Sequence, residues 1–217
     1  MVAGLHHLGS MTGSSVLAQS KQPELAAAVF AHRSGGLWLP AISTLIVASI
    51  PEVEDLEVGD RPELIVVAGN PGNIKQSRIN ELPEILLVTD YPAVWQQTGL
   101  HAWSEWRGGG LRVVPRMPDL LTDGVLVVPG EYHPVVSVGD AASTRQRLPA
   151  YLVYSKAILI PGPAASGASF DIGRGLPPSL APLAESGSAE AFVLRGGVAL
   201  PLGKLPLKAR QVRTQSA

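Results

Sequence analysis

Side chains that can bind a metal ion gather in one short stretch of the sequence, PGEYHPVVSVGD at residues 129–140. A divalent ion needs several oxygen or nitrogen ligands that converge on one point. In a strand, alternate side chains share a face, so Glu131, His133 and Ser137 would point the same way, and Asp140 could join them from the following turn. The stretch therefore offers a candidate metal site at Glu131, His133 and Asp140, of the kind that a metal-dependent hydrolase or lyase uses, with a divalent metal such as zinc.

The same stretch has a second interpretation in which it does no chemistry. Its valines favour a strand that begins at His133, and Glu131 and Asp140 are then solvated turn residues. The spacing of His-Pro and Ser-x-x-Asp resembles the zinc motif of the JAMM isopeptidases, but that motif has a histidine where this chain has Glu131 and a longer segment before the serine. Short motifs match often by chance. The interpretation as a plain strand that binds no metal or other cofactor is therefore favoured. No catalytic residues are assigned.

A second group of candidate side chains lies in the segment VWQQTGLHAWSEWRGGG, residues 94–110. Aromatic residues beside an arginine are common at subunit interfaces and in ligand clefts. Trp103 and Trp106 are three residues apart, as on one face of a helix. Because tryptophans bury a large area, packing in the core or between subunits is favoured over a ligand platform. The candidates for ligand or partner contact are Trp95, His101, Trp103, Trp106 and Arg107.

Motifs of several enzyme classes are absent from the sequence. It contains no Gly-x-x-x-x-Gly-Lys phosphate loop, no Gly-x-Gly-x-x-Gly dinucleotide motif and no Gly-x-Ser-x-Gly nucleophile elbow. It also contains no cysteine, which excludes disulfides, thiolate metal sites and cysteine nucleophiles. These absences leave it uncertain whether the protein is an enzyme.

Charged residues are sparse, at 16% of the chain with a net charge of −1, whereas soluble domains average about 25%. Nucleic-acid-binding proteins usually carry a basic excess, so the composition gives no clear indication of nucleic-acid binding. Interface cores are depleted of charge, which predicts that a second copy or a larger assembly covers part of the surface. The main functional prediction is therefore an oligomeric structural or scaffolding subunit that acts through self-assembly or protein–protein contacts.

The sequence gives no indication of a membrane span. The longest apolar run, near residues 37–50, is interrupted by Pro40 and polar residues, and it is shorter than the roughly 20 residues that a spanning helix needs. The amino terminus lacks a charged segment followed by an apolar one, which a signal peptide would have. We therefore expect a cytoplasmic location.

The expected elements are one helix and many strands. A helix is predicted between Ser20, which can cap it, and Gly35, which can end it. RPELIVVAGN at 61–70 is echoed by LPEILLVTDY at 82–91, and unbroken aliphatic runs of this kind favour buried strands. The intervening residues could form a minimal parallel crossover or a long antiparallel loop. Further strands are expected within 37–49, 111–117, 124–138, 150–162 and 191–203.

These elements predict a mainly β (α+β) fold, a β-barrel or sandwich with one N-terminal helix and a small helical insertion. The alternative is an α/β fold with a short parallel crossover around residues 63–90. The predicted organisation is a flexible N-terminal tail at 1–19, a single β-rich domain at 20–203 and a basic C-terminal tail at 204–217. A long loop rich in proline, glycine and serine is expected at 161–186.

Overall fold

The structure is a computed structural model of the 217-residue chain. It describes residues 16–18, 29–49, 62–69, 82–121, 125–139, 145–162 and 169–209.

The described strands form three sheets, and the largest is a seven-stranded sheet with its strands in chain order. Its members are β1 (Val16–Ala18), β2 (Val29–Ala31), β3 (Leu37–Leu39), β4 (Thr44–Val47), β5 (Leu64–Ala68), β6 (Glu84–Val88) and β7 (His101–Trp103). Strands β1 to β4 pair antiparallel, whereas β4 to β7 pair parallel. The two aliphatic runs of the near-repeat are therefore neighbouring parallel strands, and their connection is a crossover.

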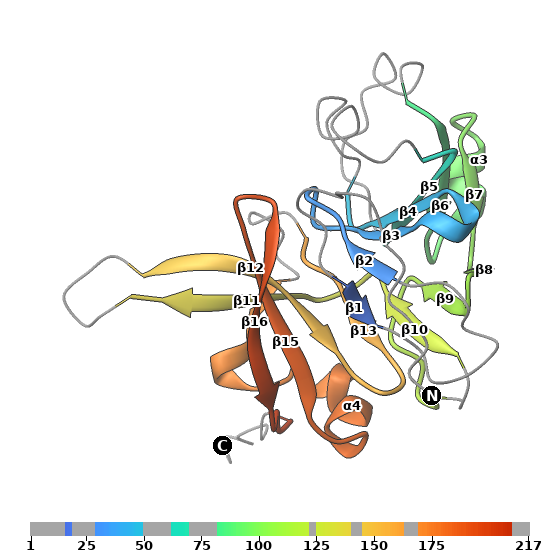
Figure 1. The fold of residues 1–217 in the computed structure, drawn as a ribbon. Helices are drawn as coiled ribbons and strands as arrows, with labels where there is room; N and C mark the ends of the chain where they lie inside the picture. Colours follow the sequence, from blue (N-terminus) through green and yellow to red (C-terminus); the bar gives the residue numbers. More distant parts are fainter. Residues whose placement is uncertain are drawn as a thin grey trace, which may run out of the picture.

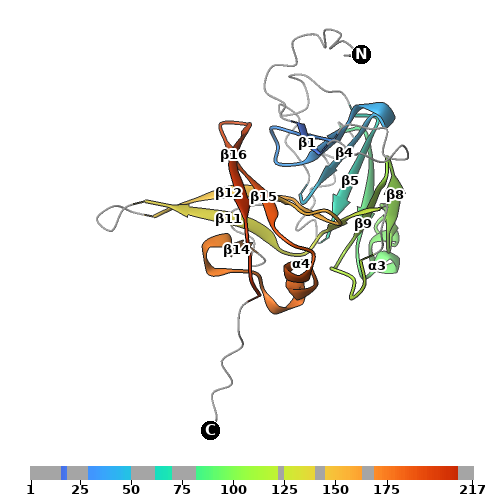
Figure 2. The same cartoon turned by 60° about the horizontal axis from the view of Figure 1, so that its bottom comes forward.

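Two further sheets lie beside the first one (Figures 1 and 2). The three-stranded sheet contains β8 (Trp106–Gly108), β9 (Leu111–Val114) and β10 (Leu126–Pro129). The six-stranded sheet contains β11 (His133–Val138), β12 (Gln146–Val153), β13 (Ile158–Leu159), β14 (Ser169–Asp171), β15 (Ala189–Arg195) and β16 (Val198–Leu205). Within it, β14 pairs parallel to β11. The β11–β12 hairpin extends away from the rest of the molecule in both views.

Helical elements in the described ranges are all short. They are η1 (Pro40–Ile42), α3 (Pro92–Gln96), η2 (Ile172–Arg174), η3 (Pro178–Leu180) and α4 (Ala181–Glu185). None of them is long and apolar enough to cross a membrane.

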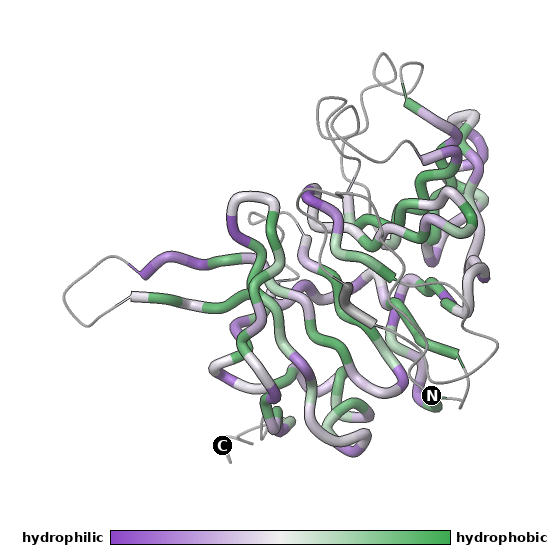
Figure 3. The backbone as a smooth tube through the Cα atoms, in the orientation of Figure 1, coloured by the Kyte–Doolittle hydropathy of each residue, from purple (hydrophilic) through white to green (hydrophobic). Residues whose placement is uncertain are grey.

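Both faces of the central strands β4, β5 and β6 are largely buried, which explains why these strands are unbroken aliphatic runs. One face presents Ile46, Val66 and Val88 to a core shared with strands of the other two sheets. The opposite face presents Ile65 and Leu87 to a second cluster that includes Trp38 and Leu100. Figure 3 shows green, hydrophobic segments along these strands at the upper right of the view.

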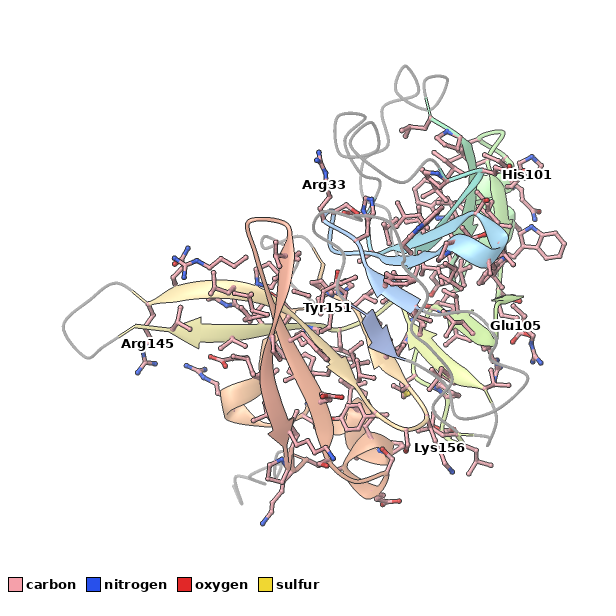
Figure 4. The ribbon with its side chains drawn as sticks, viewed as in Figure 1. Arg33, His101, Glu105, Arg145, Tyr151 and Lys156 are labelled. Carbon is pink, nitrogen blue, oxygen red and sulfur yellow. The ribbon has the colours of Figure 1, made fainter. Side chains whose placement is uncertain are left out.

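Tyr151 ties the large sheet to the six-stranded sheet. Its side chain is fully buried, and its hydroxyl shares one proton between the carbonyl oxygens of His32 at 3.2 Å and Gly36 at 3.0 Å. These two residues flank the β2–β3 turn, so the contact fixes that turn against β12 (Figure 4). Burial raises the pKa of this hydroxyl far above its usual value, and the group stays a neutral donor.

The prediction of a mainly β, α+β fold is confirmed, whereas a barrel is not. The predicted N-terminal helix is wrong at Val29 and Phe30, which lie in β2, and its earlier residues fall outside the described ranges. The predicted loop at 161–186 is wrong for 169–185, which contain β14, two 3₁₀ turns and α4. Trp103 and Trp106 do not share a helix, because they lie in β7 and β8.

Candidate functional site

The carboxyl ends of parallel strands β5 and β6 meet the end of β10. A Cβ atom added to Gly130 would lie 2.3 Å from the backbone nitrogen of Gly69, so the two chains touch backbone to backbone after β10 and β5. Gly69 also has a φ of 95°, which favours glycine. Ligands of open α/β sheets bind at the carboxyl ends of the strands. The polar residues that follow these strands therefore form the candidate site.

Two carboxylates and an arginine form an ion cluster at this edge. Arg116, which follows β9, donates from Nε to Asp90 Oδ2 at 2.7 Å. The same nitrogen lies 3.7 Å from Glu131 Oε2. Desolvation raises the pKa of Glu131, Arg116 opposes that rise, and the charge of Asp90 adds to it. The cluster therefore places two acidic groups around one exposed guanidinium.

His133 lies two residues beyond Glu131 and is 5% exposed. Its Nδ1 lies 3.2 Å from the carbonyl oxygen of Ile160, which can only accept, so Nδ1 carries the proton. Burial lowers the pKa of the imidazole, against the opposing effect of that hydrogen bond. The ring is therefore neutral near pH 7, and Nε2 keeps a lone pair that can bind a metal ion or accept a proton.

The absence of a side chain at Gly162 leaves room for the imidazole. A Cβ atom there would lie 2.3 Å from Cδ2 and Cγ of His133. The ring is thus confined between the backbone at Gly162 and the carbonyl of Ile160. This confinement fixes the direction of Nε2.

The predicted metal ligands do not lie in one strand. Strand β11 begins at His133, and Tyr132 before it has a left-handed φ of 58°, so Glu131 belongs to the preceding turn. Asp140 lies outside the described residues. Among the residues that the structure describes, no three or more His, Asp or Glu side chains are placed to hold one metal ion.

The side chains predicted from residues 94–110 are not brought together. Trp95 in α3 packs against one face of the large sheet, whereas Trp106 packs against the core on the other face. His101 and Trp103 are exposed on β7. Arg107 donates from Nε to Glu105 Oε1 at 2.8 Å. Figure 4 shows His101 and Glu105 at separate places on the surface.

Sequence reasoning did not select Asp90 or Arg116. Asp90 could have been found, because it follows the second aliphatic run of the near-repeat, where a parallel strand ends. Arg116 has no such signal. It contacts a residue 26 positions away through the pairing of the sheets.

No protein-family model matches the sequence, and no curated protein matches it either. Among solved structures, the crystal structure of the nuclease MPE from Pseudomonas putida has the same fold, with a TM-score of 0.54 and 14% sequence identity. The match covers 81% of this chain and 95% of that chain.

This comparison corrects the main functional prediction. The chain was expected to be an oligomeric structural or scaffolding subunit, but it shares its fold with a nuclease. Sparse charge and missing motifs therefore do not distinguish a scaffold from an enzyme with this fold. The oligomeric state itself stays a prediction.

Proposed function

We propose that the protein is a hydrolase that acts on the phosphodiester bonds of nucleic acid. The observation that carries the proposal is the confined, neutral imidazole of His133, which begins β11 two residues after Glu131 of the acidic cluster. The fold shared with a nuclease supports the choice of substrate. In this reaction the oxygen of a water molecule bonds to phosphorus while the bond between phosphorus and the leaving sugar oxygen breaks, and the water loses one proton as the leaving oxygen takes one up.

His133 is suited to bind a divalent metal ion. Metal-binding histidines usually donate their other ring nitrogen to a carbonyl or carboxylate, which fixes the tautomer. The Nδ1 contact with Ile160 provides this arrangement. The described residues supply too few converging ligands for a metal on their own, so water and phosphate oxygens of the substrate would have to complete its coordination beside His133 and Glu131.

The cation that binds here would have to compete with Arg116. Its guanidinium already neutralises much of the charge of Asp90 and Glu131. Since Arg116 is exposed, it can turn toward solvent at little cost. It would then be available to contact a substrate phosphate, for which a guanidinium is well suited.

Cleavage assays on the purified full chain test the proposal. Labelled single-stranded and duplex DNA and RNA are incubated with Mn²⁺, Mg²⁺ or Zn²⁺, or with a chelator. The expected result is metal-dependent cleavage that His133→Ala and His133→Gln reduce about 100-fold, in line with typical losses of a metal ligand or acid–base group. His101→Ala, which removes an exposed histidine, is the matched control and keeps full activity.

Two results would overturn the proposal. One is the absence of cleavage with every substrate and metal. The other is full activity in both His133 variants when circular dichroism shows that they are folded. Binding of Mn²⁺ measured by calorimetry gives a readout besides activity, and it is expected to weaken in Glu131→Gln.

A further inference from the structure

A pocket of about 400 Å³ lies on the six-stranded sheet, where β11, β12, β14 and η2 meet. Its polar lining residues are Ser137, Arg145, Arg147, Ser169, Asp171 and Arg174. Phe170, whose side chain is buried in the core, also borders the pocket. Figure 3 shows the outer part of β12, which carries Arg147, as hydrophilic, and Figure 4 shows Arg145 at the far end of the hairpin.

The pocket is positively charged, because it contains three arginines and one aspartate. Burial alone would raise the pKa of Asp171, but hydrogen bonds from Ser137 and from the amide of Gly173 outweigh it and lower the pKa. The charges of Arg174 and Arg147 act in the same direction. The carboxylate therefore stays ionised.

The aspartate has a structural role that leaves the pocket basic. Asp171 accepts a hydrogen bond from the hydroxyl of Ser137, which joins β14 to β11, and another from the amide of Gly173 at 2.9 Å. Arg147 Nη2 lies 3.2 Å from the hydroxyl of Ser169. This contact holds the guanidinium at the pocket wall.

Phosphate is the ligand that this chemistry fits best. Guanidinium groups bind phosphate through two parallel N–H donors, and hydroxyl groups add single hydrogen bonds. A volume of about 400 Å³ is in the range of small-ligand pockets and exceeds what one phosphate needs. It leaves room for an attached sugar.

The pocket and the candidate reaction centre lie on one strand. His133 begins β11, and Ser137 is four residues further along it. At about 3.3 Å per residue, the separation along the strand is about 13 Å. Phosphates on one strand of a duplex repeat about every 3.4 Å along the axis. A backbone held at the pocket could therefore reach His133 within about four nucleotides.

We propose that this arginine pocket binds backbone phosphates of a nucleic acid. Its binding chemistry stands by itself, whereas its role in holding a strand for cleavage near His133 depends on the proposed function. The overall charge of the chain did not indicate it, because the three arginines are a local concentration within a balanced sequence.

Fluorescence anisotropy with a labelled 12-nucleotide single-stranded DNA, in EDTA, tests the proposal without cleavage. The expected result is binding that the double variant Arg145→Gln/Arg147→Gln weakens at least tenfold. The slope of the binding constant against salt concentration, both on logarithmic scales, should become shallower by about one to two, as expected for the loss of one to two phosphate contacts. Arg195→Gln, an exposed arginine at the end of β15 outside the pocket, is the matched control and binds as the wild type does. Both substituted residues of the double variant are exposed, so its melting temperature should not change.

Three outcomes would overturn it. The first is equal affinity of wild type and double variant, and the second is an equal loss in Arg195→Gln, which would indicate diffuse attraction only. The third is a mononucleotide that competes as well as the oligonucleotide, since the site would then be a nucleotide pocket. If the hydrolase proposal fails, these three binding measurements keep their meaning, because EDTA prevents metal-dependent cleavage in all of them.

Discussion

Replacing Gly162 with alanine tests the confinement of His133. The added Cβ would lie 2.3 Å from Cδ2 and Cγ of the imidazole and 2.7 Å from Nδ1. Carbon atoms in contact are best separated by about 3.5 Å or more, so the ring must move by about 1 Å. A displacement of that size breaks the 3.2 Å contact between Nδ1 and the carbonyl of Ile160.

The expected loss of stability follows from two effects. Overpacking a buried position costs about 1–3 kcal/mol, and losing one hydrogen bond adds about 1 kcal/mol. The free energy of unfolding should therefore fall by about 2–4 kcal/mol. For a chain of this size, the melting temperature should fall by roughly 5–15 °C.

A double-mutant cycle measured by urea unfolding separates the steric effect from other causes. Gly162→Ala, His133→Ala and the double variant are compared with the wild type. In the His133→Ala background the new methyl group meets no ring, so its cost should fall by at least about 1 kcal/mol. Gly173→Ala is the control, because Gly173 is exposed and its Cβ would meet only the end of one side chain, Asp171 Oδ1, at 3.3 Å. Strictly additive costs for Gly162→Ala and His133→Ala would refute the reasoning.

Three further predictions concern the fold and its pH dependence. Tyr151→Phe removes the buried hydroxyl whose proton is shared between the carbonyl oxygens of His32 and Gly36, and it should lower the free energy of unfolding by about 1–3 kcal/mol in urea titrations, with an unchanged far-ultraviolet circular dichroism spectrum. Gly130→Ala places a Cβ 2.3 Å from the backbone nitrogen of Gly69. The free energy of unfolding should fall by more than about 3 kcal/mol, or the protein should be insoluble when expressed. A wild-type yield and melting temperature would contradict this expectation. Burial lowers the pKa of His133 below 6.5 in the folded protein. As the pH falls below about 6.5, the imidazole is protonated more readily in the unfolded chain than in the folded one, so stability should fall. Melting curves of His133→Gln should show a shallower fall over that range.

The central strands could be predicted because both of their faces are buried. The runs at β5 and β6 need aliphatic residues at every position, and that pattern survives without knowledge of the neighbours. Their parallel pairing could not be predicted, since the same residues suit an antiparallel loop. The direction is decided only by the register of the two strands, which runs in parallel from Leu64 opposite Glu84 to Ala68 opposite Val88.

Local patterns failed where strand pairing overrides them. The spacing of Trp103 and Trp106 is that of a helix face, but β7 pairs with β6 and β8 pairs with β9. Val29 and Phe30 fit a helical stripe, yet Phe30 pairs with Trp38 in a hairpin. Tertiary pairing outweighs such short-range signals, because helix propensities differ by less than about 1 kcal/mol per residue.

The candidate site was predicted in its local part only. Glu131 and His133 are close in sequence, so a scan for ligand-type residues finds them. Asp90 and Arg116 join them through contacts between sheets, which no spacing along the chain encodes. The left-handed Tyr132 also removes the alternation on which the predicted geometry depended.

The two candidate regions are coupled through β11. Its first residue, His133, belongs to the strand-end site, and its fifth, Ser137, binds the aspartate of the arginine pocket. Pairing with β14 on one side and β12 on the other prevents the strand from sliding. The spacing between pocket and imidazole is therefore set by the sheet rather than by a loop, which is what a site needs if it binds a nucleic-acid backbone at one point and acts on it at another.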